Sequence, residues 1–119
     1  MRIAMIACLL PLATAAIGCG ASFPPPNDEW AAAQADIGRA EAGGAPGVPN
    51  AKLHLQLAQE DLQKSKNLID NDNKRAADLI AVARVEAQLA LSLAKEQVAE
   101  AAAQKAQDDL AKTKTGGAQ

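Results

Sequence analysis

The sequence predicts an all-α protein: an antiparallel helical hairpin with a long third helix and a short N-terminal helix, three helices in a coiled-coil-like arrangement. Alanine is the commonest apolar residue, whereas the 119 residues include one Trp, one Phe and no Tyr. Alanine, Leu, Gln, Glu and Lys favour helices. Apolar residues recur at alternating intervals of three and four, and two clusters of Gly, Pro, Asp and Asn interrupt this pattern. Because alanine buries little area, we expect thin helix-on-helix packing.

The first helix is expected over about residues 28–42. Asn27 or Asp28 can cap it, and the acidic start suits the positive end of the helix dipole. Gly38 weakens the helix by up to ~1 kcal/mol relative to alanine and could permit close packing. A segment with three Gly and two Pro at 43–49 ends it. Four residues share the apolar face: Trp30, Ala33, Ile37 and Ala40. We expect Trp30 to dock on the hairpin as its largest apolar anchor, with a partner or headgroup contact as the alternative.

The second helix is expected to start at Pro49 or Asn50 and to run for about 20 residues. The four polar residues Asp70–Asn73 predict a tight turn, because Asn tolerates the left-handed conformation and Asp or Asn can cap the next helix. A calcium loop is disfavoured, since the run lacks a Gly at the bend and a downstream bidentate Glu. The expected coiled-coil seam, and the residues that widen it, are Leu55, Ala58, Leu62, Ser65 and Ile69, with Leu53, Leu57 and Leu68 beside them.

The third helix is expected from about Lys74 to Lys112, a stretch with neither Pro nor Gly. At this length it is about twice as long as the second helix, which therefore covers only its first half. The first helix then covers part of the remainder, or the remainder projects alone, or it meets another chain. Two seams are expected to pack: one of Ala76, Ile80, Ala83, Ala87, Ala90 and Ala94, and a neighbouring one of Leu79, Val82, Leu89 and Leu93.

The N-terminus predicts a lipoprotein signal peptide over residues 1–18. Arg2 precedes a short apolar stretch, too short for a comfortable transmembrane helix. The segment Ala16-Ile17-Gly18-Cys19 resembles a lipobox, which makes Cys19 the lipidation site. An ordinary signal cleaved elsewhere and an uncleaved membrane anchor are the alternatives. Gly20 favours the outer membrane, because Asp at that position tends to retain lipoproteins in the inner membrane. Residues 19–27 are then a lipidated Cys with a Pro-rich tether that holds the helical domain, 28–114, off the bilayer, and 115–119 form a disordered tail.

No residue pattern predicts catalysis. His54 is the only histidine and is expected on the rim of the second helix, without a second His or Cys to form a metal site. Ser65 and Ser92 lack a neighbouring His, and adjacent carboxylates on a helix point apart. The net charge of −2 and the absence of a basic patch disfavour nucleic acid. We therefore expect no enzymatic activity, no cofactor, no metal and no small-molecule substrate.

The apolar blocks of the chain resemble the domain of unknown function 4398 family over roughly residues 28–100. The blocks concerned are Gly44-Ala45, Val48–Leu62, Asn73–Leu79 and Ala83–Ala94. The family often has Gly-Asp or Gly-Glu where this chain has Asn71-Asp72. The resemblance implies a short, Ala-rich, helical protein of a Gram-negative bacterium. Many members are lipoproteins, some are joined to an OmpA-like peptidoglycan-binding domain, and the family implies no activity.

The expected function is that of an envelope lipoprotein, a structural or protein-interaction module displayed in the periplasm. The membrane is the expected partner through the lipid on Cys19, together with an envelope protein or a second copy of the chain. A self-assembling coiled-coil spacer and a periplasmic chaperone or accessory subunit are the alternatives.

Overall fold

The structure is a computed structural model, in which residues 22–116 are described, and within that range it is all helical. The elements are α1 (Asn27–Ala42), the short 3-10 helix η1 (Ala45–Gly47), α2 (Pro49–Lys66) and α3 (Asn73–Gly116). The predicted fold class is confirmed: two shorter helices accompany a third of 44 residues, which is about 66 Å long.

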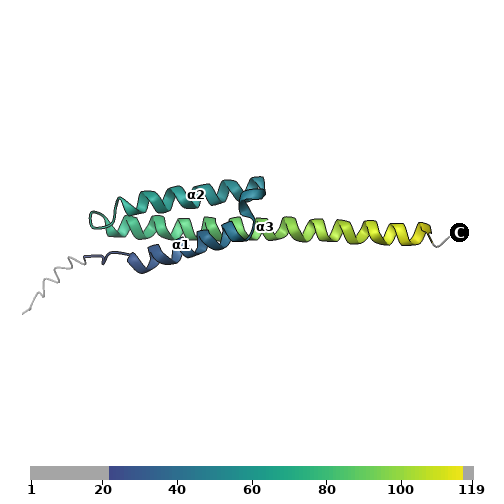
Figure 1. Ribbon diagram of the computed structural model, residues 1–119. Helices are drawn as coiled ribbons and strands as arrows, with labels where there is room; N and C mark the ends of the chain where they lie inside the picture. The colour runs from purple at the N-terminus through teal and green to yellow at the C-terminus, as the bar shows by residue number, and fades with distance from the viewer. Residues whose placement is uncertain (1–21, 117–119) are drawn as a thin grey trace, which may run out of the picture.

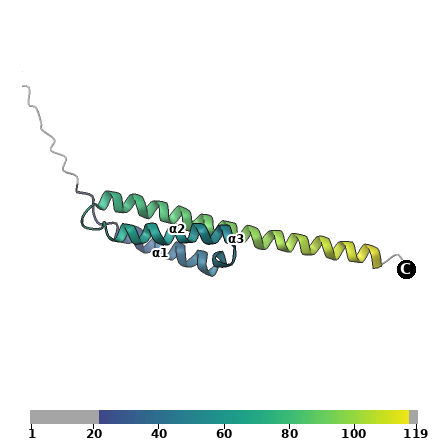
Figure 2. The same cartoon turned by 90° about the horizontal axis from the view of Figure 1, so that it is seen from above.

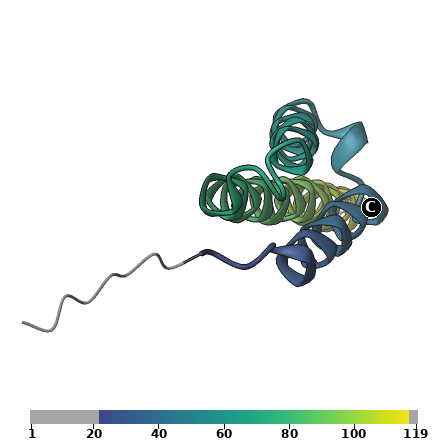
Figure 3. The same ribbon diagram turned by 90° about the vertical axis from the view of Figure 1, so that its left-hand side faces the viewer.

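Both shorter helices lie along the first half of α3 (Figure 1). Helix α1 runs parallel to α3 and α2 runs antiparallel to it, so the α2–α3 turn and the start of α1 lie at one end of the molecule. Viewed from that end, α3 lies against both α1 and α2, which contact each other much less (Figure 3). Beyond the bundle α3 continues alone (Figure 2). Neither α1 nor α2 buries any residue of α3 from 95 to 116.

The core follows one seam of α3. All six residues of this predicted seam are buried, and we call them the inner seam: Ala76, Ile80, Ala83, Ala87, Ala90 and Ala94. Helix α2 contributes Leu55, Ala58 and Leu62, and α1 contributes Ala33, Ile37 and Ala40. Because most of these side chains end at Cβ, the helices pack through small residues, as the composition predicts.

The prediction that the second seam packs against the other helices was wrong in part. Val82 and Leu89 are 46% and 39% exposed, and Leu53, predicted to widen the α2 stripe, is 54% exposed. The shorter helices flank the inner seam and leave the outer side of α3 in water. Only Leu79 and Leu93 of the predicted second seam are half-buried.

The α2–α3 turn starts earlier than predicted. Helix α2 ends at Lys66, because the backbone N–H groups of Leu68 and Ile69 both donate to the Ser65 carbonyl and tighten the chain. Asp70, rather than an Asn, takes the left-handed conformation, with φ of 71°. Asp72 caps α3, since its Oδ1 accepts the backbone N–H three residues on, at 3.1 Å.

Two glycines shape the α1–η1 link, and neither is Gly38. Gly44 has φ of 90°, a conformation that favours glycine. A Cβ on Gly43 would collide with Leu91 Cδ1 of α3, so the end of that side chain occupies the space beside the link. A Cβ on Gly38 would meet nothing within 4 Å, so the expected packing role of Gly38 was wrong.

Candidate functional site

Cys19, the predicted lipidation site, lies outside the described residues, as do the predicted signal peptide and Gly20. The described chain begins just after them, beside the α2–α3 turn. Asn73 Nδ2 donates to the Phe23 carbonyl at 2.8 Å, and Pro26 is buried. Phe23 itself is 50% exposed. The second half of the predicted tether is therefore fixed to the helical domain at the turn.

A buried carboxylate joins α1 to α3. Asp36 is 4% exposed, and its Oδ2 accepts a hydrogen bond from Arg84 Nε at 2.8 Å. Arg39, one turn further along α1, pairs with Asp36 Oδ1. Two guanidinium groups therefore compensate one carboxylate that has lost its hydration. Sequence reasoning missed this cluster, because no local pattern distinguishes Asp36 from a solvated acidic residue.

A second polar bridge joins α2 to α3. His54 Nδ1 and Glu86 Oε2 lie 2.6 Å apart, and both side chains are about three-quarters buried. His54 thus lies on the rim of the helix, where the sequence placed it, but with a carboxylate partner. The Ser65 and Ser92 hydroxyls each donate to a carbonyl of their own helix. Neither serine is bonded to His54, so the structure does not bring these residues together as a nucleophile and base.

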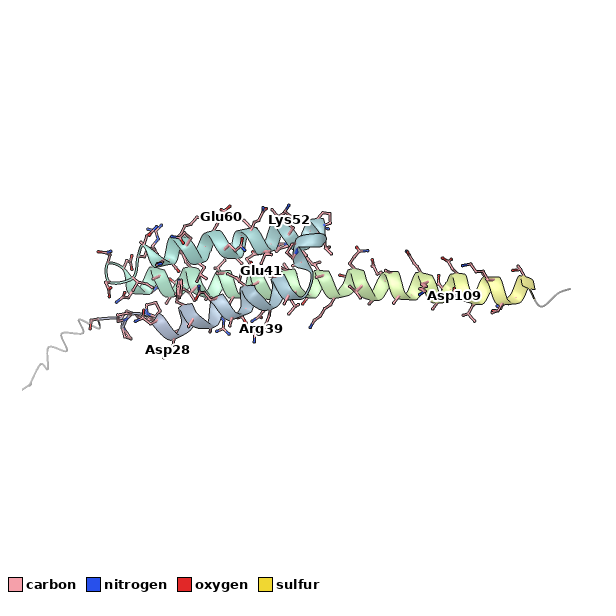
Figure 4. All side chains as sticks on the ribbon, viewed as in Figure 1. Asp28, Arg39, Glu41, Lys52, Glu60 and Asp109 are labelled. Atoms are coloured by element: carbon pink, nitrogen blue, oxygen red, sulfur yellow. The ribbon has the colours of Figure 1, made fainter. Side chains whose placement is uncertain are left out.

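A shallow groove separates α1 from α2. Its volume is about 320 Å³, and it is lined by Trp30, Gln34, Ile37, Gly38, Glu41, Gln59, Leu62 and Gln63. Gln59 Nε2 donates to Glu41 Oε1 at 2.8 Å and links its two walls, and Glu41 is labelled in Figure 4. Trp30 packs against the core, as predicted, and Lys66 Nζ lies 5.8 Å from the centroid of its ring. The groove is of small-molecule size, with glutamines around its mouth.

Neither a metal centre nor a membrane span is found within residues 22–116. No group of three or more His, Cys, Asp or Glu in this range is placed to hold a metal ion. The acidic turn instead uses its side chains locally, since the Asp70 backbone N–H donates to Asn73 Oδ1 at 2.7 Å. Of the helices described, none combines the length and apolar character needed to cross a membrane.

The second half of α3 is the largest surface without an intramolecular partner in the described chain. Every residue from 95 to 116 is exposed. Asp109, labelled in Figure 4, marks how far this segment extends beyond α1 and α2. Its acidic and basic residues are equal in number, and the larger apolar side chains are Val98 and Leu110, 67% and 62% exposed. Such a surface is open to a partner helix.

Comparison with known proteins identifies a family without a known function. Searches of curated proteins and of solved structures found no match. A family model, described as a domain of unknown function (DUF4398), matches residues 28–106. This range includes α1, α2, both polar bridges and much of the projecting part of α3. The match spans well over half of the chain, and the protein therefore belongs to the DUF4398 family.

Proposed function

We propose that this protein is a lipoprotein of a Gram-negative envelope, anchored by lipid on Cys19 in the outer membrane and facing the periplasm. Its helical domain acts as a structural or protein-interaction module. The N-terminal sequence supports the anchor, because an apolar stretch of signal-peptide length ends in a lipobox-like segment. Two or more acyl chains hold a protein stably on a bilayer, since each buried methylene contributes ~0.8 kcal/mol.

The projecting half of α3 is the observation that carries the role as a module. The Phe23 carbonyl accepts a hydrogen bond from Asn73 at one end of the bundle. Helix α3 starts at that end and runs along the bundle and beyond it (Figure 1). Four peptide units join Cys19 to Phe23 and reach at most about 14 Å. A lipid on Cys19 would keep the turn within this distance of the bilayer, and α3 could then present its free half well into the periplasm.

The groove between α1 and α2 favours this role over that of a chaperone. At about 320 Å³, with Gln34, Gln59 and Gln63 at its mouth, it offers little apolar surface to an unfolded segment. The inner seam is already covered by α1 and α2. A chaperone needs an open apolar groove, whereas an interaction module needs an exposed helix face.

The anchor is tested by comparing Cys19→Ser with Cys8→Ser, the second being a matched control because Cys8 lies in the segment proposed to be removed. Both strains receive radiolabelled palmitate, and the envelope is separated into inner and outer membranes. The wild type and Cys8→Ser are expected to carry label in the outer membrane, and Cys19→Ser to carry none. Label on Cys19→Ser protein, or its normal maturation and retention in the membrane, would contradict the proposal.

A further inference from the structure

Helix α3 carries a second heptad seam on its solvent side, which we call the outer seam. Its spacing alternates strictly between three and four residues from Val82 to Leu110. All nine members are exposed: Val82, Val85, Leu89, Ser92, Glu96, Ala99, Ala103, Ala106 and Leu110. Four of the five large apolar side chains that α3 exposes belong to it, and Val85 is 64% exposed. The repeat continues from the bundled half of α3 into the free half, with Ser92 and Glu96 as polar members at the junction.

A seam with this period is suited to another helix rather than to a flat surface. Apolar residues repeated every 3.5 residues form a stripe that two helices can share by supercoiling. In heptad notation the a positions are Val82, Leu89, Glu96, Ala103 and Leu110, and the d positions are Val85, Ser92, Ala99 and Ala106. The alanines of the free half permit close approach, and Leu110 supplies bulk near the end.

The charges beside the outer seam match a parallel copy of the same helix. In a parallel pair, each g residue faces the e residue five positions further along the other helix. Lys95 then faces Glu100 of the second copy, and Asp109 faces Lys114 of the second copy. The other g positions, Ala81, Gln88 and Ala102, are uncharged, so no like charges meet between e and g; within the seam, Glu96 faces Glu96 of the second copy. An antiparallel pair sets e against e and g against g: the register that faces Lys95 with Asp109 also faces Glu100 with Glu100 of the second copy.

We propose that α3 pairs with α3 of a second copy of this chain, parallel and in register, through the outer seam. The inference rests on the proposed function, since it names the partner of the interaction module. A parallel arrangement also suits two chains anchored at the same end in one membrane. Glu96 is the polar residue among the a positions. A polar residue at such a position lowers the stability of the helix pair while fixing its register.

The first test uses the chain from Gly20 onward, which lacks the lipid and any cysteine. This part folds on its own, because the whole described core lies between Ala33 and Ala94. Light scattering and sedimentation at micromolar to millimolar concentrations are expected to show a dimer. Ala103→Glu, at an a position, should raise the dissociation constant more than about tenfold, because it buries two unpaired charges. Ala101→Glu, on the opposite side of the same helix, should leave it unchanged.

Orientation and register are tested with single cysteines under mild oxidation. Ala106→Cys at a d position is expected to form a disulfide-linked dimer readily, whereas Ala101→Cys is not. Glu96→Leu should tighten the dimer without producing larger species, because it replaces the polar a residue with an apolar one.

A monomer at millimolar concentration, equal effects of Ala103→Glu and Ala101→Glu, or failure of Ala106→Cys to cross-link would each overturn the proposal. None of these results would alter palmitate labelling at Cys19. Conversely, an unlabelled Cys19 would leave the dimer in solution untouched, so the two proposals fail separately.

Discussion

Removing Arg84 should destabilise the bundle measurably, because it leaves the buried Asp36 carboxylate with one partner. Asp36 has a side chain that is 3% exposed, and Arg84 Nε donates to it at 2.8 Å across 48 residues of chain. The change to make is Arg84→Met, which keeps a long apolar stem on α3 but removes the guanidinium.

The lower of two limits sets the expected loss of unfolding free energy. Leaving a buried charge wholly unpaired costs about 3–5 kcal/mol, and losing one hydrogen bond to a charged group costs about 1.5–3 kcal/mol. Arg39 still pairs with Asp36, and the Arg84 side chain is 41% exposed, so the lower limit applies. We expect about 2 kcal/mol, which lowers the unfolding midpoint of a domain of this size by roughly 10 °C.

Fluorescence of Trp30 is the appropriate assay, because this single tryptophan packs against the core. Helical circular dichroism would mix the bundle with the free half of α3. Lys52→Met is the control for charge removal, since Lys52 is exposed and has no ion pair within the described range. Asp36→Leu combined with Arg84→Met should be less destabilising than Arg84→Met, because the pair is replaced as a whole. Equal midpoints for Arg84→Met and Lys52→Met would refute the role assigned to this bridge.

Three further changes test the packing and the turn by the same fluorescence assay. Gly43→Ala should lower stability by about 1 kcal/mol, the lower end for an inserted methyl group, because the Leu91 side chain must move to admit it. Gly38→Ala should raise stability by up to ~1 kcal/mol, and the same sign for both would contradict the contact between Gly43 and Leu91. Asp72→Ala should lose the α3 cap and about 1 kcal/mol, and an unchanged midpoint would show that the cap is dispensable. Deleting residues 99–119 should leave the unfolding midpoint of the monomer unchanged, since none of the described residues in this segment, 99–116, is buried; a lower midpoint would mean that the free half contacts the bundle.

The inner seam could be predicted because it follows from a local rule. Ala76, Ile80 and Ala94 fall on one 3.5-residue repeat, and a helix with such a stripe buries it wherever a second helix is available. The same rule identified Ala33, Ile37 and Ala40 on α1. All of these residues are buried in the structure.

The Asp36 bridge could not be predicted, because its cause is tertiary. Asp36 lies next to Ile37 in an ordinary helical segment, and no local sequence pattern indicates that its carboxylate is shielded from water. Its burial depends on Arg84, which only the fold brings within 2.8 Å. The glycines pose the same difficulty, since only the fold places Leu91 of α3 against Gly43 and leaves open space beside Gly38.

The choice between two seams on one helix was also beyond the sequence. Both the Ala seam and the seam with Val82 and Leu89 satisfy a coiled-coil spacing, and either could have faced the shorter helices. The alanines allow the closer approach, and the shorter helices flank them in the structure. The bulkier residues were left in water as a result. A helix periodicity thus indicates that a face is suited to packing, without indicating which partner packs on it.

The helicity of the free half does not by itself require a partner. Starting a helix is unfavourable because several residues must be ordered for one hydrogen bond, but extending a helix is not. The bundle orders the first turns of α3, so a segment rich in Ala, Gln, Glu and Lys continues the helix without tertiary contacts. Helix propensity does not explain which residues occupy which positions along the free half. It does not account for Leu110 falling in phase with Val82, nor for Lys95 and Glu100 flanking that phase at the spacing a parallel copy would match. Those two features, rather than the length of the helix, are the argument for self-association.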